Sequence, residues 1–241
     1  ALAAALPPPA GFHRVELADG SFGAWLRALP LRAPGAPVRS FRGDVLHRGD
    51  DPRIAAVAEL DVGDRDLQQC ADSIMRLVAE WQAATGHADR IAFPIGHGST
   101  LAWSRWAAGD RPVITDDDRV TWHHRAAADR SHAQLREFLD VVFRWAGTVT
   151  LADTARRVER ARVRPGDLLV LGGRPGHAVL LLDVAIDDAG HRRALIGQGF
   201  MPAQDFQILA HDGDPWFSLD DDAVDTPFWA PFPWSALRRL D

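Results

Sequence analysis

The strongest constraint on the fold is a series of short apolar segments, separated by turn signals, that begins at about residue 165 and ends at about residue 200. Turns are indicated by PGD at 165–167, RPGH at 174–177 and DDAG at 187–190. The segments that follow them, DLLVLGG, HAVLLLDVAI and ALIGQGF, are typical of strands, because each is a short apolar block bounded by glycine or proline. Upstream, apolar residues recur at helical spacing. Helices followed by an antiparallel meander predict an α+β fold.

The best-defined helix is predicted at about 67–85. Asp66 and Gln69 fit an N-terminal capping box with Asp66 as the cap, and Gly86 is a typical stop. One face is apolar at spacings of three and four residues, as expected for a helix packed on a core. The residues of that face are Leu67, Cys70, Ala71, Ile74, Leu77, Val78 and Trp81. We expect this helix, which carries Cys70 near its N-terminus, to pack on the meander.

Other elements complete one predicted domain over residues 12–241. The pattern predicts helices within 20–31, over about 133–145 and after Thr150, and strands over 38–41, 54–62, 91–95 and 207–209. Regular structure returns at 234–240. Residues 1–11 are small, apolar and rich in proline, and we interpret them as a flexible tail or linker. We interpret residues from about 90 to 160 as an insertion.

Composition excludes several kinds of chemistry. The chain contains no Lys, Asn or Tyr, so it has no lysine for a Schiff base or a pyridoxal phosphate anchor, and no cofactor is expected. The net charge is −6 and no basic run stands out, which disfavours a nucleic-acid partner. No stretch is long and apolar enough for a membrane span. The ten histidines form no HExxH pattern, so no metal site is predicted. The oligomeric state stays open.

The single cysteine, Cys70, is the leading candidate for a catalytic group. Near a helix start, free backbone N–H groups and the helix dipole stabilise a thiolate and lower the thiol pKa from its usual ~8.5. Gln68 and Gln69 precede it and are candidates to donate hydrogen bonds to an oxyanion. His177 opens a strand after a glycine-rich turn, and Gln198 is a polar residue in the next apolar run.

Cys70, His177 and Gln198 together resemble the catalytic site of papain-like cysteine hydrolases, in an order similar to that of NlpC-type peptidoglycan endopeptidases. The resemblance implies that Cys70 attacks a carbonyl, His177 accepts its proton and returns it to the leaving group, and Gln198 orients the imidazole. Two features depart from the NlpC pattern. Those enzymes carry an Asp-Cys-Ser-Gly turn, whereas Ala71 and Asp72 follow Cys70 here, and the interval from cysteine to histidine is longer in this chain.

A second resemblance covers roughly residues 11–241. The blocks that carry it are GSFGAWLRALPL, DVGDRDLQQCADSIMRLVAEW, FRWAGTVTL, GDLLVLGGRPGHAVLLLDVA and QGFMPAQDFQIL, followed by PWF. They resemble an uncharacterised bacterial family, the domain of unknown function 4846. No established activity comes with this family. The resemblance implies that the Cys, PGHA and MPAQ blocks form one domain, and that the protein acts outside the cytoplasm, in the periplasm or on a lipid anchor.

Three further residues are candidates to bind a substrate. Gln204 follows Gln198 by six positions. Trp103 and Trp106 lie three residues apart on one side of a predicted helix, and their rings suit stacking on sugars or peptide side chains.

Three functions remain open at this point. The first is a thiol hydrolase that cleaves an amide bond in a small peptide, such as a cell-wall peptide, and the second is an acyltransferase that uses the same dyad. The third is a non-catalytic ligand-binding domain on the same scaffold. The hydrolase requires the Cys70 Sγ within about 4 Å of a His177 ring nitrogen at the foot of an open cleft. A buried Cys70 without a histidine partner favours the binding domain.

Overall fold

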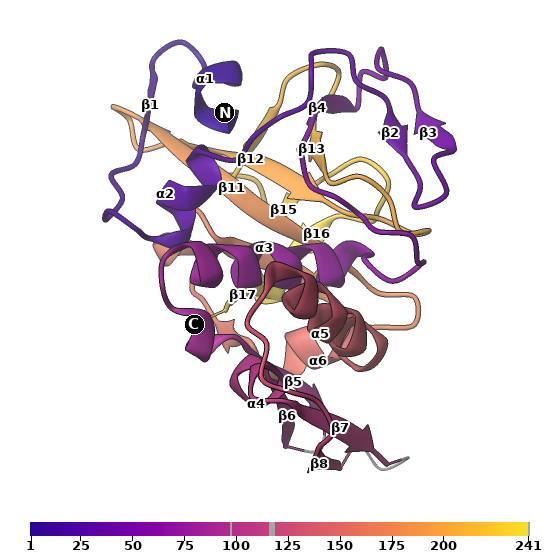
Figure 1. Ribbon diagram of the computed structural model, residues 1–241. Helices are drawn as coiled ribbons and strands as arrows, with labels where there is room; N and C mark the ends of the chain where they lie inside the picture. The colour runs from indigo at the N-terminus through magenta and orange to yellow at the C-terminus, as the bar shows by residue number, and fades with distance from the viewer. Residues whose placement is uncertain (97, 116–118, 241) are drawn as a thin grey trace.

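The computed structural model describes residues 1–96, 98–115 and 119–240 of the chain (Figure 1). Its centre is an antiparallel sheet with the strand order β4-β13-β12-β11-β10-β17-β9, in which β1 also pairs with β11, and β14 with β12. The predicted α+β class and the meander β10-β11-β12 are therefore confirmed. The strands are β1 (Phe12–Arg14), β4 (Ile54–Val57), β9 (Arg156–Arg157), β10 (Asp167–Leu171), β11 (His177–Asp187), β12 (Arg192–Gln198), β13 (Gln207–Leu209), β14 (Trp216–Ser218) and β17 (Leu237–Arg239).

Strand β11 occupies the middle of the sheet, and its sequence explains why. Its first nine residues are all buried. Ala178, Leu180 and Leu182 belong to the core on the helical side of the sheet, whereas Val179 and Leu181 belong to a second core on the opposite face. A strand that is covered on both faces has no polar face. The apolar run in HAVLLLDVAI therefore shows almost no alternation.

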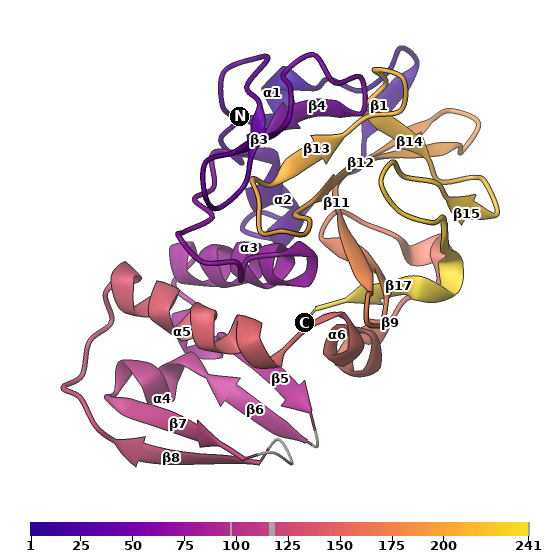
Figure 2. The same cartoon turned by 90° about the vertical axis from the view of Figure 1, so that its right-hand side faces the viewer.

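Helix α3 (Cys70–Ala84) covers one face of the sheet, with α2 (Phe22–Arg27) beside it (Figures 1 and 2). The opposite face is closed by the C-terminal segment, which contains β15 (Ala223–Val224), β16 (Phe232–Pro233) and the 3-10 helix η3 (Trp234–Ala236). A hairpin of β2 (Val38–Arg39) and β3 (Val45–His47) precedes β4, and the 3-10 helix η2 (Arg160–Arg162) precedes β10.

The start of α3 differs from the prediction. The backbone N–H of Gln69 donates to Asp72 Oδ2 at 3.1 Å, so the capping interaction lies three residues later than expected. Asp66, the predicted cap, instead accepts hydrogen bonds from the Gln69 side chain and from the Ala203 amide. Cys70 is consequently the first residue of the helix rather than its fourth.

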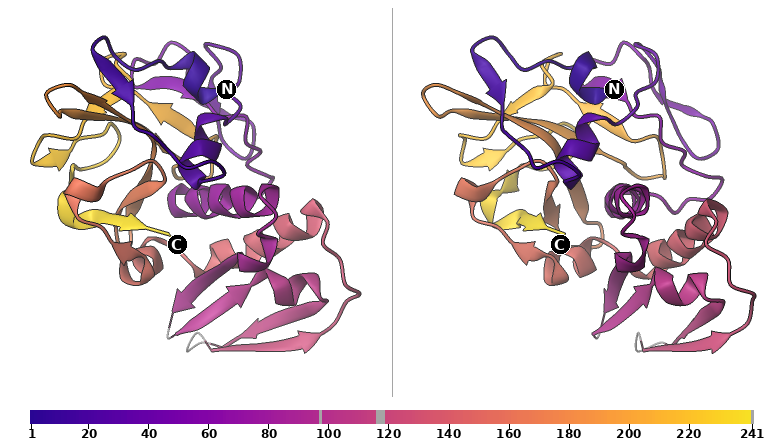
Figure 3. Two further views of the ribbon diagram at one scale, coloured as in Figure 1. Left: turned by 90° about the vertical axis from the view of Figure 1, so that its left-hand side faces the viewer. Right: turned by 60° about the vertical axis from the view of Figure 1, so that its left-hand side comes forward.

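The described residues between 88 and 145 form a layer on the other side of α3 from the sheet (Figure 3), whereas α6 (Thr148–Thr154) lies against β10 of the sheet. The described part of the segment 88–154 contains β-hairpins and helices, and its buried apolar side chains join the same hydrophobic cluster as those of α3. That this segment is an insertion stays a prediction. Its elements are η1 (Ala88–Arg90), β5 (Ala92–Gly96), β6 (Ser99–Ala102), α4 (Trp103–Ala107), β7 (Asp110–Ile114), β8 (Val120–His124), α5 (His132–Trp145) and α6 (Thr148–Thr154).

The N-terminal segment is packed, so its interpretation as a flexible tail was wrong. Residues Leu2–Ala5 form the helix α1, and Leu2 is completely buried in the main core. The Arg14 side chain donates to the carbonyl of Leu6, and the Trp216 indole N–H donates to the carbonyl of Pro7. The proline-rich composition suggested disorder, but these long-range contacts fix the backbone.

A buried carboxylate ties the N-terminal elements to the sheet. Asp183 lies on β11 and is fully buried, with Arg14 Nε at 2.6 Å from one oxygen and Arg27 Nη2 at 2.8 Å from the other. Both arginines are about one fifth exposed. The pair of guanidinium groups compensates the desolvation of the carboxylate, which is otherwise costly.

Removal of this carboxylate is expected to weaken the fold. In Asp183→Ala, two arginines lose their shared buried partner, so the free energy of unfolding should fall by about 3 kcal/mol. Urea denaturation followed by tryptophan fluorescence measures the change. Asp188→Ala, in the exposed turn after β11, serves as the control and should leave the midpoint unchanged. Equal midpoints for the two variants would contradict the role assigned to Asp183.

Candidate active site

The first turn of α3 lies against the ends of β11 and β12, and glycine makes this contact possible. A Cβ at Gly199 would clash with the Ser73 hydroxyl and come within 2.8 Å of the Gln69 carbonyl oxygen. A side chain therefore has no room at position 199 while the helix keeps its place. The start of α3 is thereby held beside Gln198, the last residue of β12.

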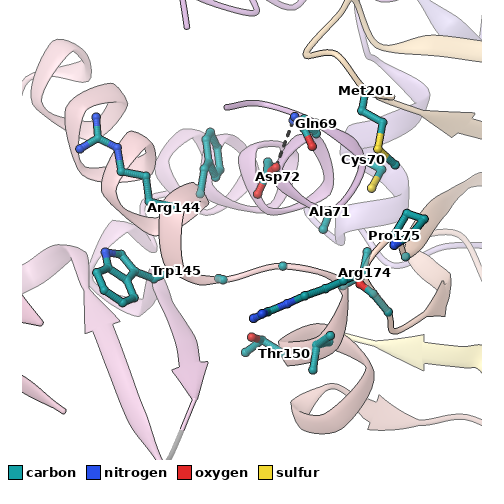
Figure 4. A pocket seen from close by; sticks show the side chains of 17 residues that line it. Gln69, Cys70, Ala71, Asp72, Arg144, Trp145, Thr150, Arg174, Pro175 and Met201 are labelled. Carbon is teal, nitrogen blue, oxygen red and sulfur yellow. Dashed lines mark hydrogen bonds between the residues drawn. The ribbon is translucent and has the colours of Figure 1, made fainter. Parts of the chain in front are cut away.

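Cys70 lines a cavity of about 320 Å³ next to this contact. The cavity is bounded by the first turn of α3, by residues 143–150 between α5 and α6, by the loop 173–176 and by Met201. In Figure 4 the Cys70 sulfur lies beside Met201 and Pro175. The thiol is nearly covered, since only 5% of Cys70 is exposed.

Burial raises the pKa of the Cys70 thiol to about 11, and the nearby carboxyl of Asp72 adds to the increase. The backbone N–H groups of Ala71 and Ala178 act in the opposite direction, but their effect is smaller. The expectation of a lowered thiol pKa was therefore wrong. The helix start does offer N–H donors, but the loss of solvent around the sulfur outweighs them.

His177 and Gln198 are in contact, as the sequence predicted. His177 Nε2 lies 2.7 Å from Gln198 Oε1, and the His177 ring packs against Phe200, Trp229 and Phe232. Burial lowers the pKa of His177 to about 4, against the smaller opposing effect of the Gln198 hydrogen bond. His177 Nδ1 is buried and has no hydrogen-bond partner among the described residues.

Cys70 and His177 both lie at the start of β11, but their side chains are on different sides of the sheet. The thiol interacts with the Ala178 amide, which is joined to His177 by one peptide bond. Ala178 faces the core on the α3 side, whereas the His177 ring packs among aromatic residues that include Phe232 of the opposite core. Among the described residues, no hydrogen bond joins the thiol to the imidazole. The contact between His177 and Gln198 is present, whereas the catalytic roles of Cys70, His177 and Gln198 stay predictions.

Asp72 is a candidate that the sequence analysis missed. It lies two residues after Cys70, lines the same cavity and is only 7% exposed. Burial raises the pKa of its carboxyl well above the usual range. Oδ2 accepts from Gln69 N, while Oδ1 has no partner in the described part of the chain. Its place three residues after Gln69 was the available signal, because that spacing also fits a capping box.

The predicted oxyanion donors are engaged elsewhere. Gln68 is buried away from the cavity, where its amide oxygen accepts from Arg76 and Arg136. Gln69 lines the cavity, but its amide N–H donates to Asp66. Gln204 is buried and does not line the cavity. The donors that interact with the thiol are backbone N–H groups, those of Cys70 and Ala71 on α3 and that of Ala178 on β11.

The two tryptophans that were candidates to stack on a substrate belong to the core instead. Trp103 is 2% exposed and packs on Phe138. Trp106 is 8% exposed, packs on the same ring, and donates its indole N–H to Gln134. Their spacing of three residues reflects the buried side of α4, which is a common arrangement for apolar side chains.

Comparison with known proteins identifies a family but no activity. A family model described as a domain of unknown function (4846) matches residues 2–239, nearly the whole chain. No curated protein and no solved structure matches the chain. Within the described residues no helix has the length and apolar character needed to cross a membrane, and no three His, Cys, Asp or Glu side chains gather as metal ligands.

Alkylation of the single cysteine tests this description of the site. Since the thiolate is the reacting form and burial raises the thiol pKa to about 11, iodoacetamide should react slowly at pH 7. The rate should rise with a midpoint near pH 11, and in denaturant the midpoint should return to ~8.5. Tryptophan fluorescence verifies folding at each pH. A midpoint below ~8.5 in the folded protein would contradict the covered thiol.

Proposed function

Because the chain belongs to the family of the domain of unknown function (4846), we propose its activity from the site itself: a thiol hydrolase that cleaves an amide bond through Cys70, His177 and Gln198. The observation that carries the proposal is the 2.7 Å contact from His177 Nε2 to Gln198 Oε1. An amide oxygen only accepts, so Nε2 carries the proton and Nδ1 keeps its lone pair. A base held in one tautomer near a thiol is the arrangement that nucleophilic catalysis requires.

The reaction has two halves joined by an acyl-enzyme. His177 Nδ1 takes the thiol proton as Sγ attacks the carbonyl carbon, and the resulting imidazolium gives that proton to the amine when the C–N bond breaks. Water then attacks the thioester with Nδ1 as base, which releases a carboxylic acid and restores the thiol. If an amine replaces water in the second half, the same steps give acyl transfer, so the acyltransferase remains an alternative.

The resting dyad is neutral at pH 7. Burial raises the pKa of Cys70 to about 11 and lowers that of His177 to about 4. Proton transfer therefore accompanies attack on the substrate rather than preceding it. The N–H groups at the start of α3 stabilise the negative charge at that moment, because the positive end of the helix dipole lies there.

The finer fold assignment belongs to the same proposal. A nucleophile on the first residue of a helix, a histidine on the first residue of the central strand and an amide on the neighbouring strand support a papain-like arrangement. The resemblance to NlpC-type enzymes makes cell-wall peptide the proposed substrate, and a location outside the cytoplasm follows from that substrate.

The second candidate is a ligand-binding domain without catalysis. It is favoured by the coverage of Cys70, which is 5% exposed, and by the missing hydrogen bond between the thiol and His177. The hydrolase remains the better account, because catalytic hydrogen bonds are often long in ligand-free sites and tighten when the substrate binds. The binding domain gives no reason for the orientation of His177 by Gln198.

Substitutions at the three positions should separate these candidates. On a panel of peptide amides, Cys70→Ala should abolish hydrolysis, and His177→Gln should lower kcat/KM by roughly 100-fold or more because the general base is lost. Gln198→Leu should lower it by roughly 10- to 100-fold because the tautomer is no longer fixed. His211→Gln changes an exposed histidine and is the matched control. Below pH about 4 activity should fall as His177 becomes protonated.

Two outcomes would contradict the hydrolase. One is hydrolysis that survives in a Cys70→Ala variant, which assigns turnover to other groups. The other is the combination of two negative results: no peptide amide of the panel is hydrolysed, and no amide or peptide electrophile forms a covalent adduct with Cys70 in mass spectrometry of the intact protein. The second outcome, together with saturable binding of a peptide, would support the ligand-binding domain.

A further inference from the structure

The cavity at Cys70 is lined by an arginine that forms no ion pair within the described part of the chain. Arg174 lines it from the loop between β10 and β11 and is exposed. Its side chain makes no hydrogen bond or ion pair with any residue that the structure describes. In Figure 4 the guanidinium extends across the cavity towards Thr150, whereas Arg144 points away from it. Asp72 carries the one carboxyl among the described lining residues.

The backbone that carries Arg174 is held in place on both sides. Thr148 Oγ1 donates to the Gly173 carbonyl at 3.3 Å. A Cβ at Gly176 would clash with the same Thr148 hydroxyl, so the loop lies directly against the start of α6. The guanidinium is therefore presented by an anchored loop rather than by a free surface segment.

The opposite wall supplies the second observation. Asp72 is nine-tenths buried, and its Oδ1 has no partner in the described structure although it borders the cavity. Burial raises the pKa of this carboxyl well above its usual range, which favours the protonated form that can donate a hydrogen bond. A buried donor without a partner is costly, and a ligand oxygen would satisfy it.

We propose that this cavity binds a small ligand that carries a carboxylate, with Arg174 holding the carboxylate and Asp72 donating to a carbonyl oxygen near Cys70. A guanidinium matches a carboxylate with two parallel hydrogen bonds, which is why arginine recognises this group well. A cavity of about 320 Å³ is at the small end of ligand pockets, so one acidic amino-acid residue with its amide fits the space. If the protein is the proposed hydrolase, its substrate is an amide with an acidic residue beside the scissile bond, and this part of the inference rests on the proposed function.

The ratio of two alkylating reagents tests the inference on the protein as it exists. Iodoacetate carries the carboxylate, iodoacetamide is its neutral counterpart, and Cys70 is the single cysteine. The ratio of their rates in the folded protein, divided by the ratio in denaturant, reports attraction of the anion to the site. We expect this quotient to be about 10 in the original protein, from one charge-assisted contact, and to approach 1 in Arg174→Gln.

Two control variants separate recognition from general charge. Arg125→Gln removes one exposed positive charge elsewhere and should leave the quotient unchanged. Arg174→Lys should keep part of the preference, since the charge remains but the paired geometry is lost. A quotient near 1 in the original protein, or a preference that survives in Arg174→Gln, would overturn the inference. Urea denaturation verifies that Arg174→Gln is folded.

Direct binding gives a second measurement that needs no reaction at Cys70. Calorimetric titration with N-acetylglutamate should give binding at least tenfold tighter than with N-acetylglutamine, and Arg174→Gln should remove the difference. Equal affinities would overturn the inference. Adduct formation at Cys70 with peptide electrophiles is scored separately. If the site prefers the anion but Cys70 forms no adduct, only the hydrolase is refuted. If Cys70 forms adducts but the site shows no preference for the anion, only this inference is refuted.

Discussion

The contact between the first turn of α3 and the ends of β11 and β12 is the constraint on which the site depends. It places Cys70 at the first position of the helix and brings its sulfur to the Ala178 amide. The contact leaves no room for a side chain at Gly199, where a Cβ would clash with Ser73. Together with Met201 and the loop 173–176, the same approach excludes water from the thiol. The closeness of the thiol to the Ala178 amide and its loss of solvent thus both result from the way this region packs.

Desolvation then determines the chemistry that the site can perform. A thiol and an imidazole that are both removed from water favour their neutral forms, and the pKa values of Cys70 and His177 move apart, to about 11 and about 4. Asp72 follows the same rule, because burial raises the pKa of its carboxyl well above the usual range. The one formal charge that projects into the cavity in Figure 4 is Arg174. A cavity whose carboxyl is driven towards its protonated form by burial and whose arginine has no partner among the described residues supports the proposal that it binds an anion.

The sequence predicted the elements well because their signals are local. The period of apolar residues indicated α3, α5 and the strands β10 to β12, and the pairing of His177 with Gln198 followed from their places on adjacent strands. The start of α3 was missed because Asp66 and Asp72 both offer a capping carboxyl, and only the fold selects between them. The thiol pKa was missed because burial depends on Met201 and the loop 173–176, which approach Cys70 from distant parts of the chain.

The distribution of unpaired polar atoms argues that this region is maintained for more than stability. The atoms include Asp72 Oδ1 and Ser73 Oγ on α3, and His177 Nδ1, Gln198 Nε2 and both amide atoms of Gln207 on the sheet. Each buried polar atom without a partner costs on the order of 1–3 kcal/mol. Gln198 and Gln207 are direct neighbours across β12 and β13, where two apolar residues would pack at lower cost. A fold optimised only for stability has no use for such a row, and the polar groups at the start of α3 and on these strands therefore support the proposed ligand and reaction.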